Sequence, residues 1–65
     1  MSVVMIETIG FGMTPIYIPK DKILRIEQNG DNQHQTRLMF ACGNEVREWL
    51  VNEPVAVLRY KYDNA

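Results

Sequence analysis

The hydrophobic pattern of the chain is clearest over Lys22–Val51, where three segments rich in apolar and β-branched residues are separated by two turn signals. The second signal, Gly43-Asn44, is a two-residue connection of the kind that forms tight hairpins, because both residues accept a positive φ at little cost. The first signal is the polar run Asn29–Gln33, which contains Asn-Gly. The pattern therefore predicts an antiparallel meander of three strands.

The Gly43-Asn44 turn also predicts the register of the second hairpin. If Cys42 faces Glu45 across the turn, the next facing pairs are Phe40 with Arg47, Leu38 with Trp49, and Thr36 with Val51. Side chains alternate between faces along a strand, so one face should carry Leu38, Phe40, Trp49 and Val51. We expect this face to form the core. The opposite face is mixed and carries Arg37, Met39, Ala41, Val46, Glu48 and Leu50.

The first hairpin has two possible registers. An odd loop of about three to five residues would place Leu24 and Ile26 on the core face, whereas an even loop would place Ile23 there. Because the odd loop buries the larger apolar set, we predict that register.

The segments before the meander predict two shorter strands. Val3–Ile9 is β-branched and apolar, and Ile16–Ile18 is a short strand bounded by prolines, which places it at a sheet edge. Between them, the glycines around Phe11 indicate a bend that presents Phe11 and Met13. Pro19-Lys20-Asp21 is expected to form a turn.

After the meander, Asn52 could cap a helix in which Val55, Leu58 and Tyr62 share one face. The alternative is a last strand over Val55–Tyr62, favoured by its β-branched and tyrosine content. We predict the helix. The fold class that follows is a single, mainly β domain over residues 1–65, with an α+β fold also possible. It would contain a small antiparallel sheet or barrel of four or five strands and a short C-terminal helix or strand.

Three short motifs resemble the layout of the short FlbD-type flagellar regulatory proteins. They are Pro19-x-x-x-Ile23-x-x-Ile26-Glu27, Gly43-Asn44-Glu45, and Val51-Asn52-Glu53-Pro54 before a short apolar tail. The resemblance covers roughly residues 16–58 and implies the same strand order. The chain departs from the family in its longer N-terminus, longer central hairpin and aromatic tail, and no functional residue is carried over.

Composition limits what such a domain can do alone. A chain of 65 residues buries only about 60% of its unfolded surface, so small domains often need disulfides, metals or oligomerisation. The single cysteine excludes an internal disulfide, and one His with one Cys is too few for a structural zinc site. Oligomerisation or docking on a partner is then the remaining way to supplement the small core. With no apolar run long enough to span a membrane, no secretory signal and a lone thiol, we expect a cytoplasmic protein.

Catalytic groups are scarce. His34 is the only imidazole available to activate Cys42, and on one extended strand the two residues would lie about 26 Å apart. We therefore expect a solvated histidine, a buried cysteine beside a turn, and no enzyme, cofactor or metal site.

The predicted function is protein interaction, as an adaptor, regulator or assembly subunit that self-associates or binds a protein partner. The expected interface residues are apolar side chains with no evident place in so small a core: Phe11, Met13, Tyr17, Met39, Val46 and Leu50. One alternative is that the two ends of the chain cover the second sheet face. The other is a nucleic-acid-binding barrel, whose surface would carry Tyr17, Tyr60, Tyr62, Arg25, Arg37 and Lys61. The formal charge of −1 weighs against that surface.

Overall fold

The computed structural model describes residues 3–65 and contains five strands, one short 3-10 helix and one α-helix. In chain order these are β1 (Met5–Ile9), β2 (Pro15–Pro19), the 3-10 helix (Lys20–Lys22), β3 (Ile23–Asn29), β4 (Asn32–Cys42), β5 (Glu45–Val51) and α1 (Val55–Asp63). β1 and β2 form an antiparallel two-stranded sheet, and β3, β4 and β5 form an antiparallel three-stranded sheet in that order. The mainly β class with a C-terminal helix is therefore confirmed.

The β4–β5 hairpin has the predicted register. Cys42 faces Glu45, and the pairing continues without a break to Thr36 and Val51. Gly43 adopts a φ of +63°, the left-handed conformation that a tight turn requires and that glycine accepts without a steric cost.

The β3–β4 hairpin combines features of both registers that the sequence allows. Its loop is Gly30-Asp31, an even loop, so the predicted odd loop is wrong. Beyond an irregularity next to the loop, however, Ile26 faces Leu38 as predicted. A second irregularity leaves Leu24 unpaired, so Ile23 faces Phe40 and is buried while Leu24 is 54% exposed. This bulge places both isoleucines on the core face and corrects the placement of Leu24.

The C-terminal segment is the predicted helix, but it begins later than the Asn52 cap implies. Pro54 holds the N-cap position without a side-chain cap, and the Asn52 backbone N–H instead donates to the carbonyl of Ile9 over 2.6 Å. Leu58 is fully buried and Tyr62 packs against the core, as the helical spacing predicted.

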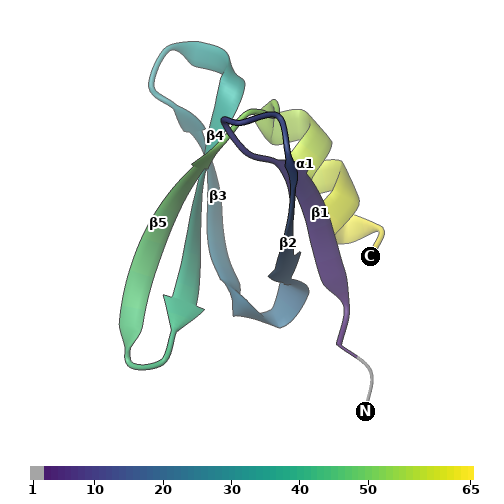
Figure 1. Cartoon of the computed structure of the whole chain (residues 1–65), viewed down its shortest axis with the longest axis vertical. Coiled ribbons are helices and arrows are strands. Elements are labelled where there is room, and N and C mark those ends of the chain that lie inside the picture. The colour runs from purple at the N-terminus through teal and green to yellow at the C-terminus, as the bar shows by residue number, and fades with distance from the viewer. Residues whose placement is uncertain (1–2) are drawn as a thin grey trace.

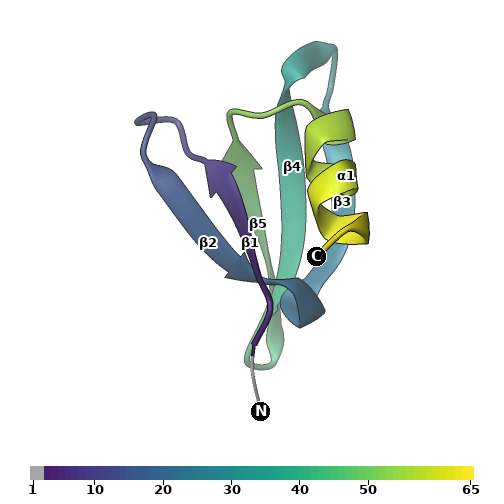
Figure 2. The ribbon, with the colours of Figure 1, turned by 90° about the vertical axis from the view of Figure 1, so that its right-hand side faces the viewer.

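All covering elements lie on one side of the three-stranded sheet. The core consists of Ile6, Ile18, Ile23, Leu38, Val51 and Leu58. These residues come from β1, β2, α1 and the face of the three-stranded sheet that carries Leu38 and Val51, here called the Leu38 face. The N-terminal hairpin and the helix therefore both pack on the Leu38 face (Figures 1 and 2). The alternative in which the chain ends cover the second face is wrong.

The covering layer, formed by β1, β2 and α1, does not extend over the whole Leu38 face. Trp49, expected in the core, is 46% exposed, because it lies on β5, the strand of the sheet farthest in order from β3, and α1 packs over β3 and β4. The β4–β5 hairpin extends past the other elements at the lower left of Figure 1. Its end is therefore open to solvent on both faces.

One buried polar group offers a direct test of the packing. The Thr8 hydroxyl is buried and has no hydrogen-bond partner within residues 3–65, whereas the buried Thr36 hydroxyl donates to the Glu53 carbonyl over 2.6 Å. Thr8→Val should raise the free energy of unfolding by about 1 kcal/mol, because it replaces an unsatisfied hydroxyl with a methyl group of similar size. Thr36→Val, the matched control, should lower it by a similar amount. Urea denaturation measures both, and a loss of stability with Thr8→Val would contradict this packing.

Candidate interaction surface

His34 and Cys42, the residues that the sequence offers for catalysis, do not come together in the described part of the chain. Within residues 3–65 no group of three His, Cys, Asp or Glu side chains could hold a metal ion. His34 and Cys42 are both exposed and lie near opposite ends of β4, so the expectation of a buried cysteine is wrong. Cys42 is exposed because it closes the turn at the open end of the hairpin.

A shallow hollow of about 230 Å³ lies between β3 and the end of α1. It is lined by Ile23, Leu24, Arg25, Ile26, Arg59, Tyr62 and Asp63. Its volume is below the roughly 300–1,000 Å³ usual for small-molecule sites, and its lining has no imidazole, thiol or hydroxymethyl nucleophile.

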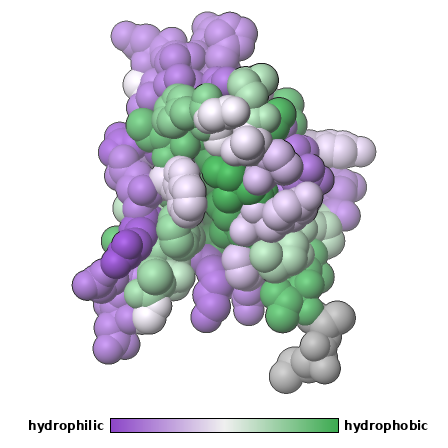
Figure 3. Space-filling view, in the orientation of Figure 1, coloured by the Kyte–Doolittle hydropathy of each residue, from purple (hydrophilic) through white to green (hydrophobic). Residues whose placement is uncertain are grey.

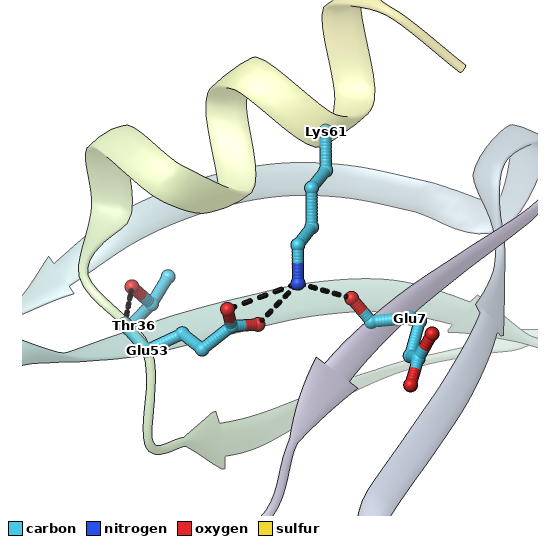
Figure 4. Close-up of polar contacts among 4 residues, drawn as sticks. All are labelled: Glu7, Thr36, Glu53 and Lys61. Atoms are coloured by element: carbon cyan, nitrogen blue, oxygen red, sulfur yellow. Dashed lines mark hydrogen bonds and ion pairs between the residues drawn. The ribbon is translucent and has the colours of Figure 1, made fainter.

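A cluster of polar contacts holds α1 on the Leu38 face, so α1 leaves the opposite face of the three-stranded sheet uncovered (Figure 4). Lys61 Nζ donates to both carboxylate oxygens of Glu53, over 3.0 and 2.9 Å, and to the Glu7 carbonyl over 2.8 Å. The Glu53 side chain is only 10% exposed. Glu7 lies on β1. Thr36 lies on β4, and its hydroxyl donates to the Glu53 carbonyl. The cluster therefore connects α1 to both sheets.

The second face of the three-stranded sheet carries three of the predicted interface residues. Met39 and Leu50 are half-buried and Val46 is 59% exposed. Among them lies the ion pair between Arg37 and Glu48, at 2.6 Å. Apolar side chains and one neutralised charge pair thus share a face that no other described element covers.

The other face of the same hairpin adds an aromatic pair that the sequence had assigned to the core. The ring centroids of Phe40 and Trp49 lie 6.1 Å apart, a favourable separation for aromatic contact. In Figure 3, which has the orientation of Figure 1, apolar side chains gather in the centre and at the lower right, and the hairpin end at the lower left is mostly polar. Alternation along the strand predicts the face of Trp49 correctly. It does not predict that Trp49 is exposed to solvent, because that depends on how far the covering layer extends over this face.

The remaining predicted residues lie elsewhere. Phe11 and Met13 are exposed on the loop between β1 and β2, where Asn52 Nδ2 lies 3.3 Å from the Met13 sulfur. Met13 therefore lies beside the segment that follows β5. Tyr17 faces Glu7 on the exposed side of the β1–β2 sheet. The structure thus groups Met39, Val46 and Leu50, and separates Phe11, Met13 and Tyr17 from them.

All three cations expected on a nucleic-acid surface are engaged with carboxylates. Arg25 pairs with Glu27 at 3.1 Å, and Arg37 and Lys61 pair with Glu48 and Glu53. Phosphate binding depends on free positive charge, so we predict no salt-sensitive retention of the protein on single-stranded DNA or RNA at low ionic strength. Chromatography on immobilised oligonucleotides checks this, and elution that shifts with salt would contradict it.

Comparison with known proteins found no match to a family model, a curated protein or a solved structure. Among the described residues, no helix is long and apolar enough to cross a membrane.

Proposed function

We propose that this chain is a non-enzymatic protein-interaction module of the cytoplasm, an adaptor, regulator or assembly subunit that binds through its β4–β5 hairpin. The observation that carries the proposal is the exposure of apolar side chains on both faces of that hairpin. Val46 lies on one face and is 59% exposed, and Trp49 lies on the other face and is 46% exposed.

The composition of the hairpin supports protein binding. Aromatic residues and methionine are enriched in protein interfaces. Here Phe40 and Trp49 lie on one face of the hairpin, and on the other face Met39 lies beside an Arg37–Glu48 pair that is already neutralised within the chain. A neutralised pair costs less to cover than an isolated charge.

Site-specific photocross-linking tests the proposal in cells of the source organism. A benzophenone amino acid in place of Val46 should form adducts with a discrete protein or with a second copy of the chain. The matched control carries the same group at Gln33, which is exposed on β4 near its turn with β3. Adducts that form equally from both positions, or from neither, would refute the proposed function.

A further inference from the structure

The two sheets leave four strand edges without a neighbouring strand in the described chain: those of β1, β2, β3 and β5. An open edge exposes backbone N–H and C=O groups, and native proteins usually cover or interrupt such edges. In an antiparallel pair, alternate residues direct both groups to the partner strand, and the residues between them direct both groups outwards. The register therefore identifies the groups on each open edge.

The edge of β1 is covered from within the chain. The Glu7 carbonyl accepts a hydrogen bond from Lys61 Nζ over 2.8 Å, and the Ile9 carbonyl accepts one from the Asn52 N–H over 2.6 Å. Both carbonyls belong to residues that face β2 without exchanging hydrogen bonds, so they point to the open side. No further strand can add there without displacing these donors.

The edge of β2 is interrupted by proline. The Lys20 N–H donates to the Val4 carbonyl, so Lys20 directs its backbone groups to β1. Because this direction alternates along the strand, Pro19, Tyr17 and Pro15 direct their backbone groups to the open side. Two of these three residues have no N–H to donate.

The edge of β3 is blocked in a different way. Its Ile26 carbonyl accepts a hydrogen bond from Arg59 Nη2 over 3.0 Å, and the bulge at Leu24 breaks the regular spacing of the strand.

Between Val46 and Leu50 the edge of β5 has none of these protections, and the Asn52 N–H that donates to the Ile9 carbonyl lies beyond the end of the strand. Its two-residue turn is closed by Cys42 and Glu45, a pair that exchanges both hydrogen bonds in hairpins of this kind, so Val46, Glu48 and Leu50 direct their N–H and C=O groups outwards. No backbone or side-chain hydrogen bond to these groups is present within residues 3–65. The strand has no proline and its register has no bulge.

We propose that a second copy of this chain pairs with this edge, β5 against β5, antiparallel, about a two-fold axis through Glu48. The inference rests on the proposed interaction function and specifies its partner. A two-fold axis between antiparallel strands requires that each residue faces a residue of the same sheet face. With the axis at Glu48, Glu48 faces Glu48 of the other copy and Val46 faces its Leu50. In no other allowed register do all three outward-facing residues pair with outward-facing residues.

The side chains are self-complementary in this register. On the second sheet face, Val46 lies opposite Leu50 of the second copy, and the same contact recurs across the axis. On the Leu38 face, Trp49 lies opposite Arg47 of the second copy, which favours a cation–π contact at each end. Arg47 is available, because within residues 3–65 its one ion pair is an exposed one with Glu45 at 3.3 Å.

The facing Glu48 side chains are the one unfavourable pair, and each is offset by Arg37 of its own chain at 2.6 Å. An axis at Arg47 would place two arginines opposite each other, each offset only by its exposed ion pair with Glu45 at 3.3 Å. An axis at Trp49 would pair Glu48 with Leu50 and leave the outward groups of Val46 beyond the strand end. The Glu48 axis is therefore favoured by both hydrogen bonding and side-chain pairing.

Cysteine cross-linking of the full chain tests this register. In a Cys42→Ser background, Glu48→Cys should form an interchain disulfide under mild oxidation, because facing residues in a hydrogen-bonded pair have Cα atoms about 5.5 Å apart. Glu45→Cys, the matched control, should not, since its two copies would lie roughly 20 Å apart. A dominant cross-link from Arg47→Cys, or none from Glu48→Cys, would overturn the proposal.

Sedimentation equilibrium of the unmodified chain provides an independent readout. We expect a reversible monomer–dimer equilibrium that Val46→Pro abolishes, because proline removes an outward N–H while leaving the β4 ladder intact. Val46→Thr should retain the dimer. A chain that stays monomeric at every concentration overturns the β5 dimer, yet photocross-linking from Val46 to another protein would then still support the proposed function.

Discussion

Leu38→Ala is expected to remove a large part of the free energy of unfolding of the protein. Leu38 is fully buried at the centre of the meander and contacts the core supplied by β1 and α1. Truncation of such a leucine costs about 3–4 kcal/mol, which includes the cavity left behind. A domain of this length has a free energy of unfolding of only about 3–10 kcal/mol in total. Circular dichroism during urea titration should show a large loss of stability or no folded baseline.

Leu24→Ala is the matched control for this substitution. Leu24 is the bulge residue of β3 and is 54% exposed, so the same change of side chain should cost less than about 1 kcal/mol. If the two variants lost stability equally, Leu24 would belong to the core and the bulge in β3 would be misplaced.

Lys61→Met should produce the second largest effect. The substitution preserves the length of the aliphatic stem and removes the ammonium group that contacts Glu53 and the Glu7 carbonyl. It leaves a largely buried carboxylate without its cation, and we expect a loss of about 2–3 kcal/mol in the free energy of unfolding. Thermal and urea denaturation at neutral pH measure this loss.

A second substitution separates the ion pair from simple packing. Adding Glu53→Gln to Lys61→Met should restore part of the lost stability, because a neutral amide tolerates burial better than an unpaired carboxylate. Lys22→Met serves as the control, since Lys22 is exposed in the 3-10 helix and should change stability little. Additive losses from Lys61→Met and Glu53→Gln would show that the two side chains do not interact.

Local patterns in the sequence predict the β4–β5 hairpin well. Gly43-Asn44 determines the turn, and alternation then determines the face of every residue up to Thr36 and Val51. The β3 strand was harder to predict because Ile23 and Leu24 are both apolar, and alternation alone does not show which of them occupies a bulge. Only the packing of Ile23 against the core decides this.

The candidate site was predictable in part. Alternation places Met39, Val46 and Leu50 on a shared face, but it does not show how far the covering layer extends over Trp49. The state of each strand edge depends on contacts between residues far apart in the chain, such as Lys61 with Glu7 and Arg59 with Ile26. No local pattern predicts those contacts, so β5 is recognised as the open edge only in the folded structure.

Amide hydrogen exchange along β5 tests the central claim, that this strand is where the chain meets its partner, most directly. The amides of Val46, Glu48 and Leu50 should exchange rapidly in dilute protein and much more slowly in concentrated protein. Those of Arg47 and Trp49, which pair with β4, should be protected at both concentrations. Rapid exchange of Val46, Glu48 and Leu50 at all concentrations and in the presence of any cross-linked partner would contradict the claim.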